Sequence, residues 1–116
     1  GTRVELRCPD PAANPYLVLA ACLEAGLDGI RNQITPPDAV TENVFEMQLQ
    51  QRAKLGIESL PGDLEQAVEE LEKDDYIKNV LGGHITEKYL EAKKAEWADY
   101  RAQVTEWEIE KYLYKI

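Results

Sequence analysis

Three charged residues near the start of the chain could do chemistry together. Arg3, Glu5 and Arg7 occupy every second position, with apolar residues between them. Side chains of a β-strand point alternately to opposite faces, so this pattern places the charged groups on one face, about 7 Å apart. A carboxylate there could ligate a hard cation such as Mg²⁺, and guanidinium groups could hold a phosphate or carboxylate at two points. On spacing alone, a solvated strand face with weak surface ion pairs is the simpler interpretation.

The element that must carry these residues is a strand over residues 1–8. Pro9 and Pro11 end it, because proline cannot donate to a strand ladder and restricts the residue before it. We find no second strand pattern, and a lone strand leaves its own backbone groups unsatisfied. The predicted fold class is therefore an α+β fragment. It is mostly α-helical, with one N-terminal strand that belongs to the sheet of a larger domain.

A buried helix is expected over residues 14–30. Asn14 is a favourable N-cap, and Pro15 suits the first helical position because its missing N–H costs nothing there. The run that follows is apolar on every side, which is typical of a helix covered on several faces. Gly29 is the expected end of this helix.

Further helices are expected over residues 63–104. Asp63 and Gln66 form a capping-box signature, and a short second pattern closes at Gly82. A long amphipathic stripe then runs through residues 85–104.

The last ten residues, 107–116, hold six large apolar or aromatic side chains. A segment this short is a marginal helix by itself. Such apolar density at a chain terminus is unusual unless something covers it.

The composition excludes several functional classes. The formal net charge of −9 over 116 residues argues against unaided binding to nucleic acid or an anionic membrane, because neutralising phosphates takes clustered Lys and Arg. We expect neither as a partner. The sequence shows no apolar run long enough to span a bilayer and no signal-peptide pattern. The expected location is cytoplasmic.

Few residues here carry metal or nucleophile chemistry. Cys8 and Cys22 lack metal-ligand spacing, so we expect two buried or half-buried free thiols in a reducing compartment. His84 is the single histidine and follows two glycines at a helix start. We expect a capping or surface role for it rather than catalysis.

The first third of the chain resembles a known signature. Residues 3–17 read RVELRCPDPAANPYL, and residues 25–32 continue with AGLDGIRN. This stretch resembles, without gaps, the pattern R-[IV]-E-[VL]-R-x-P-D-x-x-A-N-P-Y of glutamine synthetase catalytic domains. Later stretches, at residues 60–65, 91–94 and 103–108, are similar to the short-form type I enzymes. Residues 1–116 thus resemble the C-terminal part of that catalytic domain.

The resemblance implies an ATP-dependent ligase that makes glutamine from glutamate and ammonia through a γ-glutamyl phosphate intermediate. By position, Glu5 corresponds to a metal ligand, for Mg²⁺ or Mn²⁺. Arg7 corresponds to a catalytic arginine that holds glutamate and the transferred phosphoryl group, and Arg3 to an arginine near the nucleotide phosphates of the substrate ATP. Phosphoryl transfer depends mostly on positioning and charge neutralisation, which suits these residue types.

The resemblance also implies a homo-oligomer, a dodecamer of two hexameric rings, with residues 107–116 as a strap between the rings. The family's other metal ligands and an N-terminal domain lie upstream, so the fragment alone is expected to be inactive. Phe45 stands where adenylylated relatives carry a modified tyrosine, and without a hydroxyl it forms no nucleotidyl ester. This implies the short-form, non-adenylylated branch.

A hypothesis of a different class is a free-standing acidic helical module for protein interaction. It would bind partners through Trp97, Tyr100, Trp107 and the aromatic cluster at the C-terminus. Aromatic residues at helical spacing are more often core, and nothing in the sequence indicates a partner.

Overall fold

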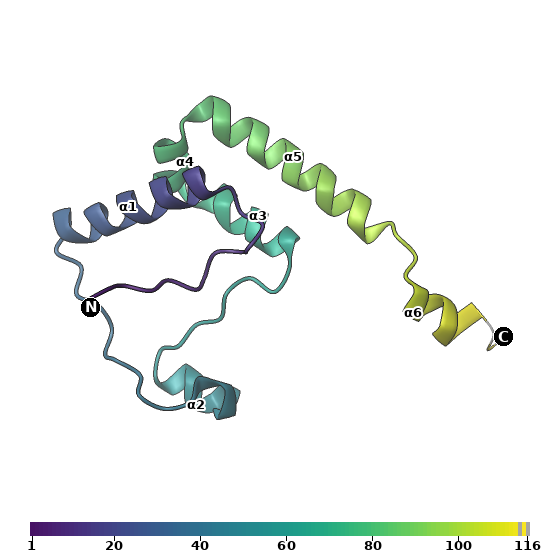
Figure 1. The fold of residues 1–116 in the computed structure, drawn as a ribbon, viewed down its shortest axis with the longest axis horizontal. Helices are drawn as coiled ribbons and strands as arrows, with labels where there is room; N and C mark the ends of the chain where they lie inside the picture. Colours follow the sequence, from purple (N-terminus) through teal and green to yellow (C-terminus); the bar gives the residue numbers. More distant parts are fainter. Residues whose placement is uncertain (114, 116) are drawn as a thin grey trace.

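A computed structural model describes residues 1–113 and 115, and within them the chain is helices and loops with no β-strand (Figure 1). A 3₁₀ turn, η1, and a π-helical turn, η2, accompany six α-helices. The bounds are α1 Pro15–Arg31, η1 Val44–Glu46, α2 Leu49–Lys54, α3 Leu64–Lys73, α4 Asp75–Leu81, α5 Gly83–Arg101, α6 Glu106–Glu108 and η2 Ile109–Leu113.

Four helices form the packed part of the molecule. Helix α4 contacts α1, α3 and α5, and α3 also contacts α5. Helix α2 lies apart from this group on a long loop, and α6 lies beyond the far end of α5 (Figure 1). The chain is accordingly extended, at 60 × 41 × 30 Å. None of the helices in the described residues is long and apolar enough to cross a membrane.

Helix α1 begins as the sequence predicts. The Asn14 side chain accepts hydrogen bonds from the N–H groups of Tyr16 and Leu17, and Pro15 takes the first helical position. Its end differs from the prediction, because the helix continues through Gly29 to Arg31.

Gln33, not Gly29, ends α1. It has a left-handed φ of 51°. The N–H of Ile34 bonds to the carbonyl of Gly29 at 2.9 Å, and the N–H of Gln33 bonds to that of Ile30 at 3.3 Å. This pattern satisfies the last carbonyls in the manner of a Schellman motif, in which glycine is the usual left-handed residue.

The helices predicted over residues 63–104 are present. Asp63 caps α3 by accepting from the Gln66 N–H at 2.8 Å, while Gln66 Oε1 accepts from the N–H of Gly62. Gly82, at φ 79°, separates α4 from α5. The Thr86 hydroxyl on α5 donates to the carbonyl oxygen of Lys78 on α4 across this corner.

The predicted strand over residues 1–8 is not formed. This segment has no regular structure and no ladder partner among the described residues, and Val4 is 97% exposed. A strand needs a neighbour for its N–H and C=O groups. The strand therefore stays a prediction for the longer protein.

Burial within the chain is sparse. Met47 and Val68 are the apolar side chains that the described residues bury, and Thr86 is buried with them. The predicted burial of α1 is not seen here: α4 covers one side, whereas Tyr16, Leu19, Leu23 and Ile30 are 65–82% exposed.

The sequence analysis did not identify α2 or η1. Helix α2 is six residues long with no side-chain cap, and such short helices carry little periodic signal. Asn43 caps η1 by accepting from the Phe45 N–H.

We predict that Gln33→Gly stabilises the protein. A left-handed conformation costs an ordinary L-residue about 1–2 kcal/mol, and glycine does not have this cost. Part of the gain is lost because glycine gives up more backbone entropy on folding. We expect the full-length protein to melt higher, by an amount equivalent to about 0.5–1 kcal/mol. Gln33→Ala is the matched control and should gain nothing. A glycine variant that melts no higher than the alanine variant would contradict the prediction.

We also predict that the 116-residue chain alone lacks a cooperative unfolding transition. Met47 and Val68 are the buried apolar side chains among the described residues, whereas a domain of this length needs a sizeable hydrophobic core to offset the conformational entropy of its chain. We expect a broad decline of helical circular dichroism on heating and no calorimetric peak. A sharp transition with an enthalpy near 0.7 kcal/mol per residue would show that the four helices suffice for a stable fold.

Candidate functional site

The N-terminal segment carries the three candidate site residues. Arg7 Nε donates to Glu5 Oε1 at 2.5 Å, so the structure places these two side chains together, although the strand expected to align them is not formed. The Arg7 side chain is 85% exposed and that of Glu5 is 53% exposed. Arg3 is exposed and makes no ion pair with any residue that the structure describes.

An exposed pair of this kind is weak. Pairs between solvated charges contribute about 0–1 kcal/mol, because water screens them and the side chains lose freedom. The Arg7 guanidinium and the Glu5 carboxylate can therefore separate at little cost when another charged group approaches either of them.

A divalent cation would find one ligand here. In the described part of the chain, no three Asp, Glu, His or Cys side chains gather as a metal site would require. Mg²⁺ is commonly held by one or two carboxylates, with water and substrate phosphates completing the octahedron. Glu5 could supply one oxygen ligand to such a site.

The remaining reactive side chains stay outside this segment or at its edge. His84 is exposed at the second position of α5, in agreement with a surface role. Cys8 and Cys22 are free, as predicted. Cys22 is half-buried, but Cys8 is exposed, since the segment that carries it is uncovered.

Helix α1, to which the charged segment is joined, is tied to α4 by a polar contact. Tyr76 Oη donates to the carbonyl oxygen of Glu24 at 3.0 Å, and Arg31 pairs with the Glu24 carboxylate at 3.3 Å. Partial burial, together with the nearby Glu24 charge, raises the pKa of the Tyr76 hydroxyl. The phenol therefore remains a hydrogen-bond donor at neutral pH.

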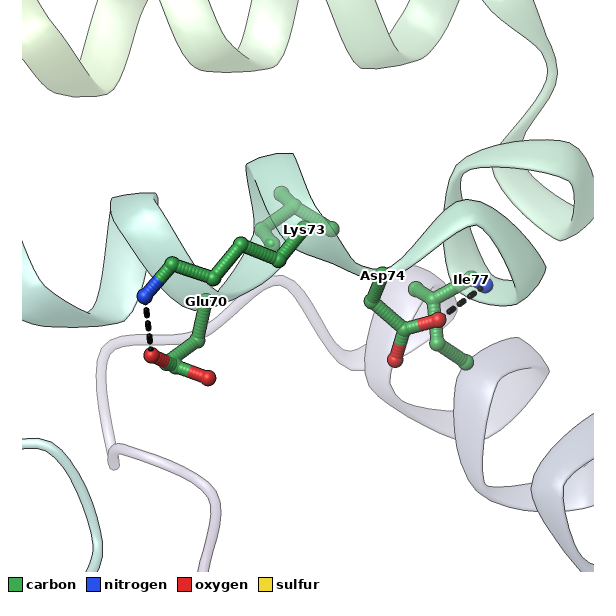
Figure 2. Close-up of a pocket in the computed structure, with 5 residues that line it drawn as sticks. Glu70, Lys73, Asp74 and Ile77 are labelled. Carbon is green, nitrogen blue, oxygen red and sulfur yellow. Dashed lines mark hydrogen bonds and ion pairs between the residues drawn. The ribbon is translucent and has the colours of Figure 1, made fainter.

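Two of the surface hollows in the described part of the chain lie away from the charged segment. The first lies at the corner between α3 and α4 and is lined by Glu70, Leu71, Lys73, Asp74 and Ile77 (Figure 2). Figure 2 shows Lys73 pointing to Glu70, at 2.7 Å, and the Asp74 carboxylate accepting from the Ile77 N–H, at 3.0 Å. The hydrogen bond with Glu70 raises the pKa of Lys73. These groups bond to one another and stabilise the corner.

The second hollow lies between α3 and α5, over Val68 and Trp97. Ion pairs bridge the two helices across it, one between Glu72 and Lys94 and one between Glu65 and Arg101. Trp97 is half-buried against α3 and stacks on Tyr100 at 5.8 Å. Its position is that of a helix-packing residue.

Comparison with known proteins identifies the family. A family model described as "Glutamine synthetase, catalytic domain" matches residues 1–112. The chain belongs to the glutamine synthetase family. The match includes Arg3, Glu5 and Arg7 and all of the packed helices.

Several relatives match over nearly the whole chain. A glutamine synthetase of Thermotoga maritima is 54% identical over 113 residues, which is 97% of this chain and 26% of the relative. That of Clostridium saccharobutylicum is 52% identical over 115 residues, 99% of this chain and 26% of the relative. That of Methanocaldococcus jannaschii is 51% identical over 112 residues, which is 97% of this chain and 25% of the relative. The chain thus spans about a quarter of the length of these glutamine synthetases.

Proposed function

We propose that the full-length protein is an ATP-dependent ligase that makes glutamine from glutamate and ammonia through γ-glutamyl phosphate. The observation that carries this proposal is the family match over residues 1–112, which includes all three charged residues of the N-terminal segment. This chain would contribute part of the active site, and by itself it would be inactive. The family match over almost the whole chain leaves the alternative of a free-standing interaction module without support.

In this proposal the three residues have different tasks. Glu5 supplies one carboxylate ligand to Mg²⁺ or Mn²⁺, and a divalent cation there neutralises charge on the nucleotide phosphates. Arg7 holds the side-chain end of glutamate and the transferred phosphoryl group with its planar fork, and Arg3 binds the phosphates of ATP. The weak Glu5–Arg7 pair would be replaced when Glu5 ligates the cation, which frees the Arg7 guanidinium for the anionic substrate.

We further propose that residues 1–8 become a strand in the sheet of the catalytic domain, of which residues 1–116 are the C-terminal part. The segment has no regular structure here, and its backbone groups are unpaired within the described residues. The same domain would bury the helix over residues 14–30, whose outer face is exposed here. We place the intact protein in the cytoplasm.

For assembly, we propose a dodecamer of two hexameric rings, with residues 107–116 as a strap between them. Thr105 and Glu108 form a capping box that starts α6, and hydrogen bonds from Thr105 lower the pKa of the Glu108 carboxyl. Trp107 and Tyr112 meet edge to face at 5.9 Å, yet both are about 60% exposed. Tyr114 and Ile116, also part of the predicted strap, lie outside the described residues.

The absence of adenylylation also belongs to the proposal. Phe45 is 98% exposed, so the position is as accessible as a modified residue would have to be. Its ring has no hydroxyl to esterify. We therefore place the protein in the short-form, non-adenylylated branch.

The activity is tested with the full-length protein and its Glu5→Gln variant. Wild type should form glutamine from glutamate, ammonium and ATP in the presence of Mg²⁺. Glu5→Gln keeps the shape but removes the ligand charge, so we expect turnover to fall at least about tenfold, equivalent to about 1.4 kcal/mol, and the Mg²⁺ requirement to rise. Glu87→Gln, on the exposed surface of α5, is the matched control. Wild-type turnover by Glu5→Gln at ordinary Mg²⁺ would contradict the role given to Glu5.

The strap is tested by deleting residues 107–116 from the full-length protein. Burying these side chains contributes about 25 cal/mol per Å² at each contact, and ring symmetry repeats the contact. We expect sedimentation velocity to show hexamers or unstable mixtures in place of dodecamers. Lys111→Ala, an exposed charge in the same segment, should leave assembly unchanged. A truncated protein that stays a stable dodecamer would show that the tail folds only against its own subunit.

A further inference from the structure

The turn over residues 10–13 joins the charged segment to α1. Asp10 Oδ1 accepts from the Ala12 N–H at 2.7 Å, and the Asp10 carbonyl oxygen accepts from the Ala13 N–H at 3.0 Å. Pro11 has no N–H, so these are all the amides between Asp10 and Asn14, and both bond to Asp10. Aspartate first and proline second is the favoured sequence of a type I turn.

The helix that follows this turn is fixed at its start. Directly after it, Asn14 caps α1, with its Oδ1 accepting from the Tyr16 N–H at 3.0 Å. The Asp10 carboxylate also has a weak electrostatic effect on α5. The pKa of the Lys93 ammonium is raised mainly by its hydrogen bond with Glu96, and the negative charge of Asp10 adds a smaller contribution.

We propose that Asp10 is a positioning residue for the site: its carboxylate holds the turn that directs Glu5 and Arg7 toward the cation and the glutamate. This inference rests on the proposed function. The strand proposed for residues 1–8 joins α1 through this turn, so loss of the Asp10 hydrogen bond would displace Glu5 and Arg7 relative to α1. Misplacement of about 1 Å can cost a site about a hundredfold.

The test compares Asp10→Ala with Asp10→Asn in the full-length protein. Asparagine keeps the oxygen that accepts from the Ala12 N–H and removes only the charge, whereas alanine removes the acceptor. For Asp10→Ala we expect the KM for glutamate and the Mg²⁺ concentration for half activation each to rise at least about fivefold. For Asp10→Asn we expect both values within about twofold of wild type.

Asp63→Ala is the matched control, because it too removes a carboxylate that accepts a backbone N–H, at 2.8 Å. It should lower the melting temperature while leaving both constants unchanged. A variant that folds poorly remains informative, since KM does not depend on how much enzyme is active.

Three outcomes would overturn the inference. The first is an Asp10→Ala enzyme with wild-type constants and only a lower kcat or melting temperature, which would mark Asp10 as merely structural. The second is an Asp10→Asn enzyme whose two constants rise as much as those of Asp10→Ala. That result would show that the charge of Asp10, and not its hydrogen bond, causes the change. The third is an Asp63→Ala control that changes both constants as much as Asp10→Ala does. Failure of the proposed function looks different: wild type itself would not form glutamine.

Discussion

The scarcity of burial within the chain is the constraint on which the rest of the structure depends. Four helices contact one another, yet few side chains among them leave water completely. Directed polar bonds therefore do much of the positioning. Tyr76 ties α4 to α1, Thr86 ties α5 to α4, and ion pairs join α5 to α3. Such bonds fix geometry well but contribute only about 0.5–1.5 kcal/mol each. The exposed apolar faces of the helices therefore leave most of the available hydrophobic stabilisation unused within the described residues.

Features that depend on neighbours in the sequence were predictable. The caps at Asn14 and Asp63 need only a side chain and an N–H two or three residues later, so sequence and structure agree. The end of α1 was not predictable in the same way. Gly29 is the residue type expected at a helix end, but the left-handed position fell on Gln33, whose side chain gives no signal of it. The short helix α2 was not predicted, because six residues carry little periodic signal.

The candidate site, too, was predictable from the sequence only in part. Alternation predicted that Glu5 and Arg7 share a strand face; the two side chains contact each other, but no strand is formed in the described residues. Spacing could not separate a ligand from a solvated ion pair, because no group of three candidate metal ligands gathers in the described residues. The predicted strand over residues 1–8 meets the same limit, since its backbone groups have no ladder partner there. Here the family resemblance, and not the local pattern, carried the functional prediction.

The corner between α4 and α5 has a mechanical consequence for the end of the chain. Helix α5 is 19 residues long, which makes it a rigid arm of about 28 Å at 1.5 Å per residue. Its direction is set at its start by the left-handed Gly82 and the bond from Thr86 to the Lys78 carbonyl, and further along by the ion pairs of Lys94 and Arg101 with α3. A change of 10° in the direction of α5 would carry the start of α6 about 5 Å sideways. The position of the aromatic tail thus depends on contacts made along α5, and substitutions at Gly82 or at the α3–α5 ion pairs would move the tail without touching any of its residues.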